Sequence, residues 1–190
     1  AVVGPSGGGK STLLNLLGTL DEPSAGRVVV DGVDVSTLQG DALADFRRAE
    51  IGFIFQLFNL VPILSALENV MLPALIKLKG SKVKKLKVKK QAVDLLEIIG
   101  LKHRVNHRPF QLSGGEQQRI AVARALINNP DIVFCDEPTG NLDSKNGDLI
   151  YNLIRQLNKE KGQTFVIVTH EEAVSKRVDQ VYRIRDGKLI

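Results

Sequence analysis

The feature that most constrains this chain is the stretch GPSGGGKST at residues 4–12. Four glycines and a lysine follow three apolar residues directly, and the apolar helical run TLLNLLG continues from the last threonine. Glycine loses much chain entropy when it is ordered, so such a cluster indicates a backbone that another group must approach closely. The order of apolar run, glycine loop and helical run predicts a turn at the carboxyl end of a buried strand that opens a helix.

This glycine loop fits the pattern G-x-x-x-x-G-K-[ST], which binds nucleotide phosphates. Backbone N–H groups of such a loop converge on phosphate oxygens, and the helix dipole adds positive potential. We expect Lys10 to reach the β- and γ-phosphates and the Ser11 hydroxyl to bind Mg²⁺. A flexible glycine turn is the alternative, and the flanking strand and helix disfavour it. The predicted phosphate-binding residues are Gly4, Pro5, Ser6, Gly7, Gly8, Gly9, Lys10, Ser11 and Thr12.

The run DIVFCDEP at residues 131–138 predicts a second buried strand, with two carboxylates at its carboxyl end. We expect Asp136 to hold Mg²⁺ through the water shell of the ion. We expect Glu137 to act as the general base for an attacking water. An acidic turn after a strand is the simpler alternative, and the nearby phosphate loop makes it less attractive.

Composition narrows the class of protein. A chain of 190 residues is long enough for one domain with an inserted part. No apolar run in the sequence approaches the ~20 residues that a membrane-spanning helix needs. The lone Cys135 excludes an intramolecular disulfide.

The net charge of +5 is largely local, because KVKKLKVKK at residues 82–90 holds six lysines. We interpret this run as a solvated helix face with Val83, Leu86 and Val93 packed beneath it. Attraction to anionic lipid is the alternative.

The stretch QLSGGEQQRIAVARALINN at residues 111–129 begins like a capped helix, with Ser113 and Glu116 in capping-box positions. The cap does not account for Gly114 and Gly115 in the first turn, where glycine weakens a helix. A second helix N-terminus that a phosphate approaches closely does account for them.

Two of these motifs resemble one protein family. LSGGEQQR resembles the signature motif of ATP-binding-cassette (ABC) ATPases, and DEPTGNLD at residues 136–143 resembles their Walker B and D-loop run. The resemblance covers essentially the whole chain. It implies that Gln56, in IGFIFQLFNL, contacts Mg²⁺ or water and senses the γ-phosphate. It also implies that His170, which closes TFVIVTH, steadies the γ-phosphate and the attacking water.

The same resemblance extends to the D-loop and to a subgroup of the family. Asn141, Leu142 and Asp143 match the D-loop, so Asp143 joins Ser113, Gly114 and Gly115 as predicted nucleotide-binding residues. Glu171 stands where many members carry Asp. The stretches GNLD, LSGGEQQR and ALENVMLP resemble the subgroup that serves lipoprotein release, macrolide efflux and the cell-division complex.

The resemblance further implies a mechanism with ATP and Mg²⁺ as cofactors. Two copies would form a head-to-tail homodimer, with each ATP between the phosphate loop of one copy and Ser113, Gly114 and Gly115 of the other. Opening and closing of this dimer would drive a separate integral membrane permease. We therefore expect a peripheral protein at the cytoplasmic face of the membrane. The alternative is a non-transport ABC ATPase that transmits force to a membrane partner in cell division.

Nucleic acid is not an expected partner, because the segment between loop and signature is too short for the coiled coil of DNA-repair members. We expect the permease to dock in a groove beside Gln56. The candidate groove residues, some of which we expect in the core, are Phe53, Phe55, Phe58, Leu60, Ile63 and Leu64.

These motifs predict an α/β fold of the P-loop NTPase type. We expect a parallel sheet with helices on both faces, an inserted helical subdomain and a partial antiparallel β subdomain. Because AVV looks like the end of a core strand, we expect further residues upstream of Ala1. The expected division of a single domain over 1–190 is a core of 1–20, 50–56 and 130–190, a β hairpin over 27–35 and a helical subdomain over 57–129.

Overall fold

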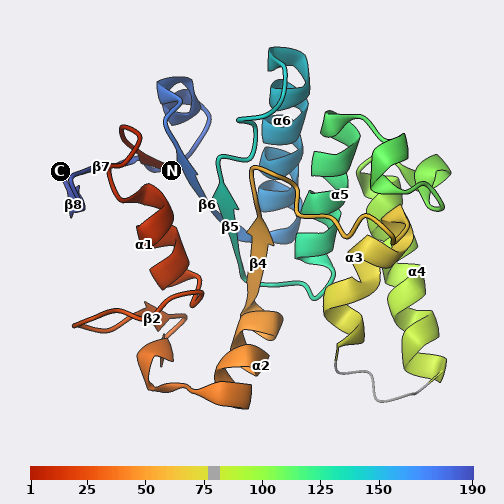
Figure 1. Cartoon of the computed structure of the whole chain (residues 1–190), viewed down its shortest axis with the longest axis horizontal. Coiled ribbons are helices and arrows are strands. Elements are labelled where there is room, and N and C mark those ends of the chain that lie inside the picture. Colours follow the sequence, from red (N-terminus) through yellow and green to blue (C-terminus); the bar gives the residue numbers. More distant parts are fainter. Residues whose placement is uncertain (77–81) are drawn as a thin grey trace.

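A six-stranded sheet forms the centre of the molecule in the computed structural model, which describes residues 1–76 and 82–190 (Figure 1). The strand order is β4-β5-β6-β1-β7-β8, and all neighbours are parallel except the β7–β8 pair. The strands are β1 (Val2–Val3), β4 (Ile51–Ile54), β5 (Ile132–Asp136), β6 (Thr164–Thr169), β7 (Tyr182–Arg185) and β8 (Lys188–Leu189).

Helices cover both faces of this sheet, as predicted. Along β5, Phe134 packs into one apolar cluster with Leu14, whereas Val133 and Cys135 pack into another with Ile150. This alternation follows from the two-residue period of a strand. Figure 1 shows α1 (Lys10–Leu17), which contains Leu14, on one side of strands β4 to β6, and α5 (Gly114–Leu126) and α6 (Ser144–Lys161) on the opposite side. The helices are α1 (Lys10–Leu17), α2 (Gly40–Glu50), α3 (Ala66–Leu75), α4 (Lys82–Ile98), α5 (Gly114–Leu126) and α6 (Ser144–Lys161).

Helices α3, α4 and α5 pack together at one end of the sheet. Helix α5 also packs on β4, where a Cβ added at Gly52 would lie 2.6 Å from the carbonyl oxygen of Ala125. Because α5 contacts both the sheet and the other helices, it links the two parts of the fold. The expected division into subdomains stays a prediction.

The lysine-rich helix α4 corrects one expectation. Val83 and Leu86 are 78% and 67% exposed and therefore do not pack beneath the lysines. The buried side of α4 is formed instead by Ala92, Leu95 and Leu96, near its C-terminal end. Val83 and Leu86 lie on the first turns of α4, whereas Val88 is partly buried and packs against the core.

Two hairpins form at Asp-Gly turns, and the first of them corresponds to the hairpin predicted over 27–35. Asp31 and Gly32 have φ of 48° and 75°, and they join β2 (Val29–Val30) to β3 (Val33–Asp34). This hairpin is shorter than the predicted 27–35, because the Asp34 side chain accepts a hydrogen bond from Ser36 N and begins a 3₁₀ turn. Asp186 and Gly187 turn the β7–β8 hairpin in the same way. Among the described residues, no helix is long and apolar enough to cross a bilayer.

Candidate functional site

The phosphate loop lies where predicted, between β1 and the first turn of α1. Gly9 is the N-cap residue of α1 with φ of 96°, a left-handed conformation that suits glycine, and no side chain caps the first turn. The N–H groups of that turn are thus available to an anion. Gly8 is held from both sides, since its N–H donates to Pro5 and its carbonyl accepts from Gly187 N. Ser6, Gly7 and Thr12 are exposed around this turn.

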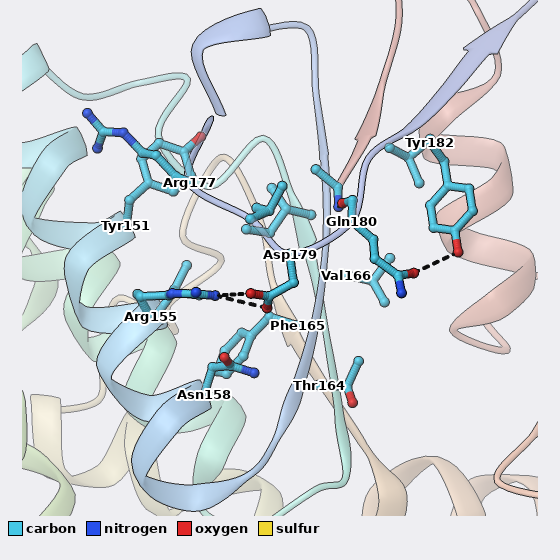
Figure 2. Close-up of a pocket in the computed structure, with 15 residues that line it drawn as sticks. Tyr151, Arg155, Asn158, Thr164, Phe165, Val166, Arg177, Asp179, Gln180 and Tyr182 are labelled. Carbon is cyan, nitrogen blue, oxygen red and sulfur yellow. Dashed lines mark hydrogen bonds and ion pairs between the residues drawn. The ribbon is translucent and has the colours of Figure 1, made fainter. Parts of the chain in front are cut away.

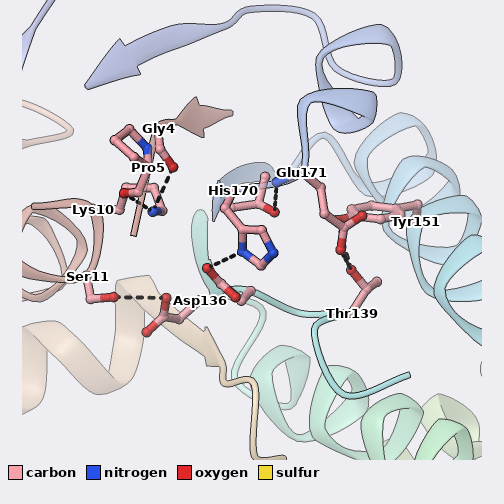
Figure 3. Close-up of polar contacts among 11 residues, drawn as sticks. Gly4, Pro5, Lys10, Ser11, Asp136, Thr139, Tyr151, His170 and Glu171 are labelled. Atoms are coloured by element: carbon pink, nitrogen blue, oxygen red, sulfur yellow. Dashed lines mark hydrogen bonds and ion pairs between the residues drawn. The ribbon is translucent and has the colours of Figure 1, made fainter. Parts of the chain in front are cut away.

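The Lys10 side chain folds back over the loop (Figure 3). Its ammonium donates to the carbonyl oxygens of Gly4 and Pro5, both at 2.9 Å, and the residue is 6% exposed. A buried cation is stable only when its donors are paired, and here the loop backbone supplies the acceptors. The lysine charge is therefore fixed beside the helix N-terminus.

Ser11, in the first turn of α1, lies beside Asp136 at the carboxyl end of β5, with Ser11 Oγ 3.3 Å from Asp136 Oδ1. Burial raises the pKa of the Asp136 carboxyl, and the neighbouring Glu137 raises it further, whereas the Ser11 hydrogen bond and the Lys10 charge lower it. The Ser11 hydroxyl and the Asp136 carboxylate, which we expect to bind the metal, therefore lie in contact with each other.

Glu137 and His170 are also brought together, although 33 positions separate them. His170 Nδ1 lies 2.8 Å from Glu137 Oε1, which leaves the other ring nitrogen of His170 for a further partner. Glu137 has φ of 42°, an uncommon conformation for a residue with a side chain, and its N–H donates to Val168 O. Backbone strain of this kind is frequent at functional sites.

Gln56 follows β4 and lies beside the same carboxylate. A Cβ added at Gly140 would be 2.7 Å from Gln56 Nε2 and 3.3 Å from Glu137 Oε2. The side chains of Gln56 and Glu137 therefore both lie next to Gly140. The Gln56 carbonyl accepts a hydrogen bond from Asn141 Nδ2 at 3.0 Å. The three predicted catalytic residues therefore converge at the carboxyl edge of β4, β5 and β6.

The remaining predicted residues form a second group, at the N-termini of α5 and α6. Ser113 caps α5 in a complete capping box with Glu116, and their hydrogen bonds hold the pKa of the Glu116 carboxyl below its usual value. Asp143 caps α6, and its two oxygens accept from the N–H and side-chain amide of Asn146. Figure 1 shows α1 and α5 apart, with the sheet between them.

The two glycines of the signature differ in their contacts inside the chain. A Cβ at Gly115 would overlap the Oδ1 atom of Asn146, so packing inside this chain already requires a glycine there. Gly114 differs, because a Cβ would come no closer than 3.5 Å to Leu142 and 3.6 Å to Phe58. Contacts inside the chain therefore account for a glycine at 115 but not at 114, and both remain predicted nucleotide-binding residues.

Comparison with known proteins decides the family. A sequence model of the ABC transporter family matches residues 1–140. The chain is 47% identical over 190 residues to the uncharacterized ABC transporter ATP-binding protein MJ0796 of Methanocaldococcus jannaschii, covering 100% of this chain and 80% of that relative. This chain belongs to the ABC transporter ATP-binding family.

Two solved structures of MJ0796 match the cassette with a TM-score of 0.87 and 46% identity, over 99% of this chain and 81% of theirs. One is described as a dimeric post-hydrolysis state bound to ADP and Pi, and the other as the dimeric structure of a bacterial ABC transporter cassette. The predicted family, fold class and ATPase class of this cassette are confirmed.

One residue of the cassette that sequence reasoning missed is Gln118. It is fully buried in α5, and its Nε2 donates to Pro138 O at 2.6 Å and to Phe55 O at 3.3 Å. Those carbonyls belong to the residues next to Glu137 and Gln56. A second donor from α5, the Arg124 guanidinium, reaches the carbonyls of Phe58 and Asn59. A polar residue in a predicted helix was the only available signal, and it did not identify the partners.

The cassette also has a cavity of about 390 Å³ between α6 and β6, which contains none of the predicted site residues (Figure 2). Apolar side chains such as Ile154 and Phe165 line it, together with the Arg155–Asp179 ion pair.

Proposed function

We propose that this cassette is the nucleotide-binding subunit of an ABC transporter, which dimerises around ATP and hydrolyses it with Glu137 as the general base. The observation that carries the proposal is the 2.8 Å contact between Glu137 and His170, beside Gln56 and the Ser11–Asp136 pair. A base, its orienting partner and a phosphate-binding loop thus share one edge of the sheet.

The expected chemistry follows from these positions. Glu137 accepts the proton of an attacking water, and His170 holds the Glu137 carboxylate in place through Nδ1. Lys10 and the free N–H groups of α1 supply positive potential where negative charge develops on the phosphates. Gln56 lies beside Glu137 and orients the attacking water.

The Ser11 hydroxyl and the Asp136 carboxylate fit Mg²⁺, which prefers oxygen ligands and takes few of them from the protein when phosphates are present. In the described parts of the chain, no three His, Cys, Asp or Glu side chains form a metal cluster. This agrees with an ion bound through phosphates and water. Such an ion would neutralise charge on the transferred phosphoryl group.

We infer that the second group of residues acts on the ATP of a partner copy in a head-to-tail homodimer. Ser113 and Gly114 begin α5, and the sheet lies between α5 and α1, the helix that follows the phosphate loop (Figure 1). Gly114 has no close contact that requires a glycine within the chain. The role of Asp143 as a nucleotide-binding residue is part of this proposal.

The proposed permease contact lies beside Gln56. Leu57, the residue after Gln56, is 73% exposed and Ile63 is 76% exposed, whereas the partly buried Phe53 stacks on Phe55. A membrane partner on this surface would place the cassette at the cytoplasmic face. Co-purification with the membrane protein of a neighbouring gene, followed by a transport assay, distinguishes export from a force-transmitting role in cell division.

The base is tested by Glu137→Gln, which keeps the shape of the side chain but removes its basicity. Turnover should fall by a factor of at least about 10², the scale of general-base catalysis, while ATP binding persists. The variant should accumulate as an ATP-bound dimer in light scattering. Glu172→Gln is the matched control, because Glu172 is exposed and pairs with Arg183, which is none of the predicted site residues. Near-normal turnover of Glu137→Gln would remove Glu137 from this role.

A further inference from the structure

A second set of polar contacts lies beside His170 (Figure 3). The Thr139 hydroxyl is 3.0 Å from the Tyr151 hydroxyl and 3.1 Å from Glu171 Oε1. Thr139 follows Glu137 by two positions, and Glu171 follows His170 directly. The ends of β5 and β6 are therefore joined twice, once by the predicted catalytic pair and once by this contact.

The direction of these hydrogen bonds follows from the chemistry of the groups. An ionised carboxylate only accepts, and a hydroxyl carries one proton. Thr139 therefore donates to Glu171, and it accepts from Tyr151. Burial raises the pKa of Tyr151 to about 12, so its hydroxyl stays protonated and remains a donor at neutral pH.

The backbone on either side of His170 is also fixed. Glu171 N donates to Thr169 Oγ1 at 3.0 Å, and Thr169 is almost fully buried. His170 itself is largely exposed, so few contacts of its own hold its ring. Its orientation then depends on the residues that precede and follow it.

Tyr151 gives the contact a rigid support. It lies in α6, and Arg177 covers its ring at 5.5 Å from the centroid. Arg177 in turn pairs with Asp148 of the same helix. The tyrosine thus places its hydroxyl against Thr139 from an element that does not contain the catalytic residues.

We propose that Thr139, Glu171 and Tyr151 are positioning residues that hold His170 against Glu137. None of the three needs to touch the nucleotide. This inference rests on the proposed roles of Glu137 and His170.

The test uses Thr139→Val, which keeps the shape of the side chain and removes the hydroxyl. We expect kcat to fall on the order of tenfold, the scale of one lost hydrogen bond to a charged group, with the KM for ATP within about twofold. Thr139→Ser should restore turnover, because it keeps the donor. Tyr151→Phe should lower kcat in the same direction. Thr164→Val is the matched control, since Thr164 is exposed at the start of β6.

A double variant separates positioning from a purely structural role. In single-turnover assays, Thr139→Val should cost nothing further when His170→Ala is already present, because the hydroxyl acts through His170. Independent, multiplying effects would overturn the proposal, as would unchanged kcat in both Thr139→Val and Tyr151→Phe. Urea unfolding of each variant shows that the folded protein is being assayed. Normal turnover of His170→Ala would instead refute the proposed function.

Discussion

At the scale of single residues, the two glycines of the signature have different physical reasons. A Cβ at Gly115 would overlap the Asn146 side chain of the same chain, whereas a Cβ at Gly114 would make only ordinary van der Waals contacts. The sequence motif alone assigned both to phosphate approach, because a motif does not show which residue packs inside the chain. The close approach of Asn146 is a tertiary contact between α5 and α6.

This difference predicts unequal effects of one added methyl group. Gly115→Ala should be less stable than Gly114→Ala by about 1–3 kcal/mol, the cost of overpacking, because the gain in helix propensity is common to both. Urea unfolding measures the difference. Gly114→Ala should instead weaken ATP-driven dimerisation, which light scattering detects. Equal stabilities would show that Asn146 moves aside without cost.

At the scale of secondary-structure elements, the sequence predicted the strands and turns well and the tertiary contacts poorly. The apolar run that ends in Asp136 forms the predicted strand, and a hairpin forms within the predicted 27–35, because these patterns act locally. Val83 and Leu86 were placed wrongly, since periodicity alone does not show where along α4 the core begins. The Thr139–Glu171 contact was missed because it depends on how β5 and β6 align.

The next prediction concerns Gln118 of helix α5, whose side-chain amide donates hydrogen bonds to the carbonyls of Phe55 and Pro138, next to Gln56 and Glu137. Gln118→Met keeps the volume but leaves two buried carbonyls without this donor, which should lower the free energy of unfolding by about 1–3 kcal/mol. Turnover should fall as well, measured where the variant is folded. The exposed Gln156→Met in α6 is the control and should change stability by no more than about 0.5 kcal/mol. Unaltered turnover in folded Gln118→Met would limit Gln118 to a structural role.

At the scale of the whole molecule, the predicted site residues fall into two groups, and within one chain the sheet lies between the helices that begin at them. Lys10, Ser11 and Glu137 lie at the carboxyl edge of the sheet, and Ser113 lies at the N-terminus of α5 across the sheet. In a head-to-tail dimer, the Lys10 group of one copy would face the Ser113 group of the other copy. ATP would then contribute to the interface, and its hydrolysis would weaken the dimer.

This arrangement predicts that binding and dimerisation can be lost separately. Lys10→Ala should abolish ATP binding by the monomer in calorimetric titration, because the phosphates lose their main point charge. Ser113→Arg should keep that binding but block ATP-driven dimerisation in light scattering, scored in a Glu137→Gln background that retains ATP.

Ser65→Arg is the matched control, since Ser65 forms the same capping box on α3, and the loss of that cap lowers the free energy of unfolding by a similar amount, about 1 kcal/mol. Ser65→Arg should therefore still dimerise. If Lys10→Ala and Ser113→Arg lost monomer binding equally, the signature would act within its own chain, and the head-to-tail dimer would be wrong.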